Sequence, residues 1–159
     1  MKRRVYLETT VVSYLTARPS RDIVTAAHQQ VTVEWWTHRR RDFDVTISEL
    51  VLREAEAGDP EAAQRRLAAL DGIPLLLLTP DVLRLAEQFL RKRLLPRRAA
   101  EDGLHIAVAT VHRVDYMLTW NCAHIANPEI QARLARWLAS DGLFLPFICT
   151  PEELLGGES

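Results

Sequence analysis

The chain has 159 residues, which is the length of one domain that can bury a hydrophobic core without disulfides. Hydrophobic residues make up 48% and charged residues 26% of the sequence, and this composition excludes a disordered chain. The net charge of −1 is unlike that of a protein that binds nucleic acid through bulk electrostatics. A nucleic acid partner would therefore require a bound cation or local basic patches.

The sequence predicts no membrane segment, since its densest apolar run, Ile73–Leu78, is far shorter than the roughly 20 residues that span a bilayer. The basic start Met1–Arg4 does not lead into a signal peptide, because Glu8 interrupts the apolar stretch that follows. We therefore expect a cytoplasmic protein. Cys122 and Cys149 form no C-x-x-C pair, so we expect two small core residues and no zinc ribbon or disulfide framework.

Short β-rich runs alternate with helical stretches along the chain, and no repeat or linker divides it, so we expect a single domain over residues 1–159. The expected strands are Arg4–Leu7, Val45–Ile47, Leu75–Leu78, Tyr116–Thr119 and Phe147–Cys149. The expected helices are Ser20–Arg40, Ser48–Ala57, Pro60–Leu70, Pro80–Arg93, Ala99–His112 and Pro128–Asp141. Alternation of this kind predicts an α/β fold with a mainly parallel sheet and helices on both faces.

Capping residues support the expected helix boundaries. Four polar residues are suited to begin helices, and most of them precede a proline: Ser48, Thr79, Asn127 and Thr150. Three glycines follow helical runs and are suited to end them: Gly58, Gly72 and Gly142.

Glu8 directly follows the first expected strand. In parallel sheets of this type, ligands bind at the carboxyl ends of the strands. A buried carboxylate there is costly unless it is paired or bound to a cation. The alternative interpretation is that Glu8 caps the turn that follows.

Glu54 is separated from the other charged residues of its helix by helical geometry. Those residues share one polar stripe, whereas at about 100° per residue Glu54 falls between Leu50 and Val51 on the face that should be buried. Glu54 is therefore expected to have a partner inside the protein.

Asp102 lies in the first turn of an apolar helix and off the polar stripe of Glu101, His105 and His112. The helix dipole favours an ionised carboxylate at that position, although a charge that only complements the dipole is the alternative. Asn121 follows the fourth strand and should emerge at the same sheet edge, but by itself it is typical of a turn.

Three buried carboxylates at one edge would repel one another unless a cation lay between them. Oxygen ligands favour Mg²⁺ or Mn²⁺, and no set of Cys and His residues at ligand spacing indicates zinc. Such a centre suits phosphodiester hydrolysis. Asp115 precedes the fourth strand, so we expect it at the opposite end of the sheet in a structural role.

Basic and aromatic residues near this edge are weaker indications of nucleic acid binding. Arg97 and Arg98, after the run Arg91–Arg93, could contact a phosphate backbone or could form a solvated face. Trp120, next to Asn121, could stack a base, and packing in the core is the alternative.

Four segments carry a resemblance to a known family: Val5–Tyr14, Ser48–Glu54, Ala100–Ala109 and Tyr116–Ile125. In this order they resemble the PIN-domain family, in particular the VapC-like toxins of bacterial and archaeal toxin–antitoxin modules. The resemblance implies a three-layer α/β/α sandwich whose five-stranded sheet has the order 3-2-1-4-5. It also implies an endoribonuclease dependent on Mg²⁺ or Mn²⁺, with RNA as substrate, an antitoxin as partner and frequent homodimers.

The resemblance also assigns roles by position. The implied metal ligands are Glu8, Glu54 and Asp102, and Asn121 stands near the fourth catalytic position. Thr9 and Thr119 match the family's hydroxyl residues near the substrate. The family usually has Asp in place of Glu8 and often in place of Asn121. These departures leave open the alternative of a catalytically weak or inactive PIN-fold protein that binds nucleic acid or an antitoxin.

Overall fold

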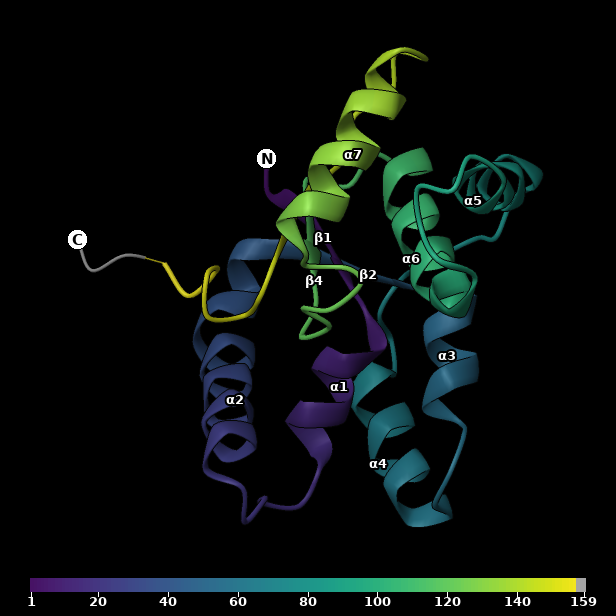
Figure 1. Ribbon diagram of the computed structural model, residues 1–159. Coiled ribbons are helices and arrows are strands. Elements are labelled where there is room, and N and C mark those ends of the chain that lie inside the picture. Colours follow the sequence, from purple (N-terminus) through teal and green to yellow (C-terminus); the bar gives the residue numbers. More distant parts are fainter. Residues whose placement is uncertain (157–159) are drawn as a thin grey trace.

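The computed structural model describes residues 1–156 around a five-stranded sheet (Figure 1). The strands are β1 (Arg3–Leu7), β2 (Phe43–Ser48), β3 (Leu75–Leu76), β4 (Tyr116–Leu118) and β5 (Phe147–Cys149). Their order is β3-β2-β1-β4-β5, and every neighbouring pair is parallel. The predicted α/β fold class and strand order are thus confirmed.

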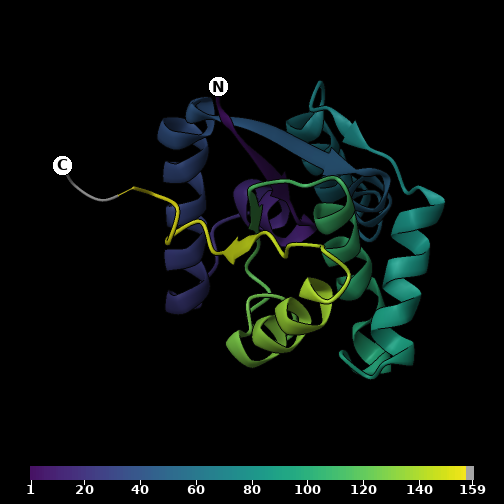
Figure 2. The same cartoon turned by 90° about the horizontal axis from the view of Figure 1, so that it is seen from above.

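Within residues 1–156, seven α-helices connect and cover these strands. They are α1 (Thr9–Thr16), α2 (Ile23–Glu34), α3 (Glu49–Ala55), α4 (Pro60–Leu70), α5 (Pro80–Arg91), α6 (Ala100–Val111) and α7 (Pro128–Ala139). Because connections between parallel strands are right-handed, α1 to α4 lie on one face of the sheet and α5 to α7 on the other. Figure 1 shows these two groups, and from above the strands run through the middle of the molecule with helices around them (Figure 2).

Helix α1 was not expected from the sequence. Its residues include a run of β-branched side chains, which have low helix propensity. Two contacts offset this preference: the side chain of Glu8 accepts a hydrogen bond from the Thr10 amide, and Val11 and Val12 are fully buried. The helix therefore forms through its cap and its packing and not through local propensity.

Other boundaries differ modestly from the prediction. The helix expected over Ser20–Arg40 begins at Ile23, and its last turn is a π-helix over Trp35–Arg39. Strand β3 is shorter than expected, because Leu77 and Leu78 leave the sheet. The helix that Thr150 was expected to begin is only a turn.

The other capping predictions are confirmed. The side chains of Ser48, Thr79 and Asn127 accept hydrogen bonds from the first-turn amides of α3, α5 and α7. Gly58, Gly72 and Gly142 have φ values of 85°, 79° and 71°, which only glycine adopts readily at a helix end.

The core lies between the sheet and the two groups of helices. Cys149 is buried there as expected. Cys122 is exposed, so that prediction is wrong: the residue lies in the turn after β4, outside the packed layers. No helix within residues 1–156 combines the length and the apolar character that crossing a membrane requires.

Candidate metal centre

Glu8 is held at the point where β1 passes into α1, and it is only 4% exposed. Its Oε1 atom accepts hydrogen bonds from the Thr10 amide at 3.2 Å, the Thr10 hydroxyl at 2.5 Å and the Thr119 hydroxyl at 2.7 Å. Among residues 1–156, none donates a hydrogen bond to the second carboxylate oxygen of Glu8, Oε2. One oxygen of Glu8 therefore caps the helix while the other is available to a ligand, so the two interpretations of this residue are compatible.

Glu54 points from α3 towards the same place. Its Oε1 atom accepts a hydrogen bond from the Thr9 hydroxyl at 2.5 Å and lies 2.7 Å from Nε2 of His105. Its side chain is 24% exposed, in contrast to Glu49 and Glu56 on the solvent side of the same helix. The predicted inward orientation of Glu54 is confirmed, and Thr9 and His105 are the partners that it required.

His105 is 1% exposed, although the sequence indicated that it belonged to a polar stripe on α6. That expectation is wrong, because this side of α6 faces the sheet and the ring finds polar partners there. Nδ1 lies 2.6 Å from the hydroxyl of Tyr6, and that hydroxyl lies 2.9 Å from Oγ of Ser48. Burial raises the pKa of the Tyr6 phenol, so Tyr6 remains a neutral hydrogen-bonding group.

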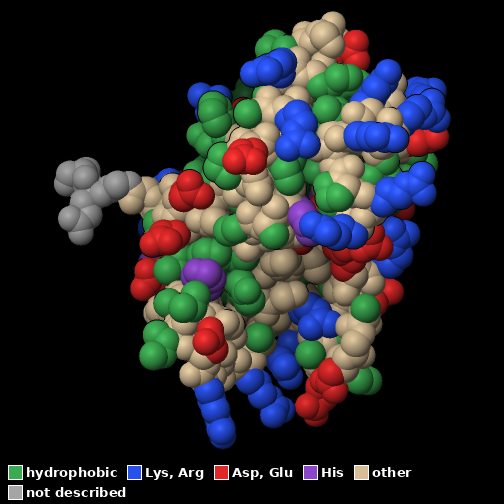
Figure 3. All heavy atoms as spheres, in the orientation of Figure 1, with side chains coloured by type: hydrophobic (Ala, Val, Ile, Leu, Met, Phe, Trp, Pro, Cys, Tyr) green, Lys and Arg blue, Asp and Glu red, His purple; other side chains and the backbone are tan. Residues whose placement is uncertain are grey.

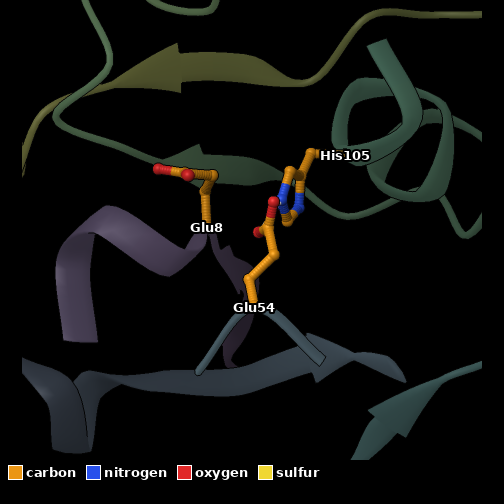
Figure 4. Close-up of side chains that lie close together, drawn as sticks. All are labelled: Glu8, Glu54 and His105. Atoms are coloured by element: carbon orange, nitrogen blue, oxygen red, sulfur yellow. Dashed lines mark hydrogen bonds and ion pairs between the residues drawn. The ribbon is translucent and has the colours of Figure 1, made fainter. Parts of the chain in front are cut away.

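These side chains form one compact group. Within residues 1–156, Glu8, Glu54 and His105 each offer a ligand atom, and these atoms lie within 4.8 Å of one another. Figure 4 shows Glu54 directed at the imidazole ring, with the carboxylate of Glu8 to one side of the pair. The group lies at the carboxyl edge of the sheet, where β1 ends and where α3 follows β2 directly.

The electrostatics divide the carboxyls into two kinds. Burial acts to raise the pKa of Glu54, but the hydrogen bonds from His105, Thr9 and Glu101 outweigh it and lower this pKa to about 2. The pKa of Glu101 is raised, because hydrogen bonding with Glu54 favours its protonated form. Glu54 is thus ionised, and Glu101, which is exposed on the polar stripe of α6 as the sequence indicated, lies beside it.

Asp102 is not a member of this compact group. Its side chain is 21% exposed, and its Oδ2 atom lies 3.2 Å from Nδ1 of His124. Since Asp102 precedes His105 by three residues on α6, the two residues are neighbours about one turn apart on the helix surface. Asp102 is therefore beside the group and pairs with a residue from the segment after β4.

Asn121 shapes that segment. Its side-chain oxygen accepts a hydrogen bond from the His124 amide at 3.1 Å, and its carbonyl oxygen accepts one from the Ala126 amide at 2.8 Å. This is the turn-forming geometry that Asn alone indicated. The turn brings His124 to Asp102, while a catalytic role for Asn121 stays a prediction.

The residues predicted to contact substrate fall into two groups. The hydroxyls of Thr9 and Thr119 donate to Glu54 and Glu8, so in this structure they hold the carboxylates in place. Arg97 and Arg98 are exposed in a short 3₁₀ helix directly before α6. Figure 3 shows Lys and Arg side chains gathered over α5 and the start of α6, with acidic side chains beside them.

Two further predictions are settled by packing. Trp120 is 8% exposed, stacks on His28 with ring centroids 4.1 Å apart and donates from Nε1 to the Thr32 hydroxyl, so it belongs to the core. Asp115 accepts a hydrogen bond from the Arg4 amide at 2.8 Å, at the opposite end of the sheet from Glu8, as a structural residue.

The order of the parallel strands, with helices on both faces of the sheet, is that of a PIN-like α/β fold. No family model and no curated protein matches the sequence. A solved structure, of VapBC2 from Rickettsia felis bound to a DNA fragment from their promoter, contains a similar chain with a TM-score of 0.58. The match covers 92% of this chain and 98% of that chain at 14% sequence identity, and a likeness at this identity establishes the fold alone.

Proposed function

We propose that the protein is a metal-dependent endoribonuclease that serves as the toxin of a type II toxin–antitoxin module. The observation that carries this proposal is the pair of glutamates at the carboxyl edge of the sheet. Glu8 and Glu54 come from distant parts of the chain, and in each the Oε1 atom is fixed by threonine hydroxyls. Two carboxylates held this close without a cation would repel each other.

The donor atoms fit a hard divalent cation. Carboxylate oxygens of Glu8 and Glu54 would hold Mg²⁺ or Mn²⁺, and Asp102, one helical turn from His105, is the proposed third ligand. When bound, the cation supplies the positive charge that makes water nucleophilic and stabilises charge on the phosphate. It also supplies the local positive charge that the chain, at a net charge of −1, lacks.

The two shifted carboxyls suit different roles. Glu54, with its pKa lowered to about 2, is a permanent anion and a weak base, so it is suited to holding a cation. Glu101, whose pKa is raised, is better suited to accept and return a proton near the attacking water. This division supports Glu101, and not Glu54, as the candidate proton acceptor.

The proposed substrate is RNA, with Arg97 and Arg98 as contacts to its phosphates. Both guanidinium groups are exposed on the segment that leads into the helix carrying Asp102. An antitoxin partner is proposed by analogy with the VapBC2 assembly to which the fold is similar. A homodimer and a cytoplasmic location remain predictions.

A second candidate is a PIN-fold protein with little or no nuclease activity that binds nucleic acid or an antitoxin. Two observations favour it: Asn121 adds no charge and is engaged in a turn, and Asp102 lies outside the compact group.

Incubating the protein with structured and single-stranded RNA in Mg²⁺ or Mn²⁺ separates the two candidates. We expect metal-dependent cleavage that Glu54→Gln and Asp102→Ala each reduce by at least about 100-fold, since each removes a proposed ligand of the cation that stabilises charge on the phosphate. Asp115→Asn, which alters a carboxylate at the far end of the sheet, is the matched control and should cleave normally. RNA binding without cleavage at any metal concentration would favour the second candidate.

A further inference from the structure

Three buried side chains and the partly exposed Glu54 connect the strands to the candidate metal centre in one line of hydrogen bonds. The line runs from Ser48 at the end of β2, through Tyr6 in β1 and His105 in α6, to Glu54 in α3. Ser48 and Tyr6 are fully buried and His105 is 1% exposed. Because these side chains are shielded from water, each of their O–H and N–H protons needs a hydrogen-bond acceptor within the protein.

The direction of the last hydrogen bond follows from the chemistry of the carboxylate. An ionised carboxylate accepts hydrogen bonds and has no proton to donate. Oε1 of Glu54 already accepts from the Thr9 hydroxyl, and the contact of 2.7 Å with Nε2 of His105 needs a proton. That proton must therefore belong to Nε2.

The rest of the line fixes the other ring nitrogen. Oγ of Ser48 accepts from the Val51 amide, so the Ser48 hydroxyl can donate to Tyr6, and the Tyr6 hydroxyl can donate to Nδ1 of His105. In this neutral arrangement every proton has one acceptor. A doubly protonated ring would turn the Tyr6 hydroxyl towards Ser48, and the Ser48 proton would then have no acceptor among residues 1–156.

We propose that His105 is a positioning residue and not a metal ligand, although it lies within the compact group. A nitrogen that carries a proton has no lone pair for a metal, so the groups left to hold the cation are all oxygens. His105 also occupies Oε1 of Glu54, which leaves Oε2 to face the cation. An all-oxygen site selects Mg²⁺ or Mn²⁺, whereas an available imidazole nitrogen would favour zinc and related metals.

This inference rests on the proposed function in one respect, since it takes Glu54 as a ligand. The protonation of His105 can be measured without any metal. Long-range ¹H–¹⁵N NMR of the metal-free protein should show the neutral ring with its proton on Nε2. Tyr6→Phe removes the donor to Nδ1 and should shift the Nδ1 resonance away from its hydrogen-bonded position.

Two substitutions separate positioning from ligation. In His105→Gln the amide can still donate to Glu54, whereas His105→Leu fills similar volume without a donor. We expect Mn²⁺ affinity to stay within about 3-fold of wild type in the first and to fall about 10- to 100-fold in the second. His112→Gln, on the same helix but bonded to the Leu77 carbonyl, is the matched control and should change nothing.

Pulsed electron paramagnetic resonance of the Mn²⁺-loaded protein provides the direct test, because a coordinated imidazole nitrogen modulates the spin echo. No such modulation is expected. Its presence, or an equal loss of affinity in the Gln and Leu variants, would overturn the proposal. A wild-type protein that bound no Mn²⁺ would contradict the proposed function. The NMR measurement would still test the protonation of His105, because a proton on Nδ1 would refute the hydrogen-bond assignment. If the Leu variant did not fold, the spin echo and NMR of wild type would suffice.

Discussion

At the scale of single residues, threonine hydroxyls organise the carboxylates of this site. Thr9 and Thr10 come just after Glu8 at the end of the first strand, and Thr119 follows the fourth, so three hydroxyls reach the edge from adjacent strands. Each donates to one oxygen of Glu8 or Glu54. Hydrogen bonds to a charged acceptor contribute more than neutral ones, so these contacts fix where the carboxylates point.

Thr119→Val tests this organisation, because it removes the hydroxyl and keeps the shape of the side chain. It removes one of the three donors to Oε1 of Glu8 and the side-chain acceptor of the Asn121 amide, so we expect the free energy of unfolding to fall by about 1–3 kcal/mol in urea titrations. We also expect Mn²⁺ affinity to fall about 10- to 100-fold.

Thr110→Val is the control for that substitution. Thr110 is equally buried, but its hydroxyl donates only to the Ile106 carbonyl within its own helix. Similar losses in both variants would show that the Thr119 hydroxyl has no special relation to Glu8.

At the scale of secondary structure, α1 shows how the site and the fold depend on each other. Its β-branched residues disfavour a helix, and the contacts that offset this are the Glu8 cap and the burial of Val11 and Val12. The same helix orients Thr9 and Thr10 towards the two glutamates. Weak packing of α1 would therefore loosen the carboxylates as well as the core.

Val12→Ala tests this dependence. Val12 is fully buried, so the variant should lose about 1.5–3 kcal/mol of stability, measured by urea unfolding. Ser13→Ala, at a half-buried neighbour, introduces a better helix former and should leave stability unchanged or slightly raised. A Val12→Ala protein as stable as wild type would show that α1 does not depend on its buried face.

At the scale of the whole molecule, the candidate centre joins the two groups of helices across the sheet. Glu8 begins α1 and Glu54 belongs to α3 on one face, whereas His105 and Asp102 belong to α6 on the other. A cation held here would bind the folded chain and not the unfolded one. Its binding free energy would therefore add to the stability of the entire domain.

Thermal unfolding with and without Mn²⁺ measures this linkage. At a concentration of about 100 times Kd, the gain of about 2.7 kcal/mol should raise the Tm by roughly 5–10 °C, and a chelator should reverse it. The double variant Glu8→Gln, Glu54→Gln should show no rise. A Tm of the wild type that does not respond to Mn²⁺ would contradict a metal centre.

The sequence alone determined most of the fold and the inward orientation of Glu54. The sequence predicts strands and the buried face of α3 from the periodic spacing of apolar residues, and it predicts helix ends from capping residues. Both kinds of pattern are local, so they can be interpreted without knowing what packs against them. The order of the strands is not local, and it was expected only because the chain resembles PIN-domain proteins.

Only the tertiary structure decided which residues meet at the edge of the sheet. His105 belonged to a polar stripe by pattern, but it is buried against Tyr6 and Glu54, which lie 99 and 51 residues away in the sequence. A helical wheel shows which residues share a face and not what that face contacts. For this reason the sequence predicted two of the three residues of the compact group, Glu8 and Glu54, and the packing of α6 on the sheet supplied His105.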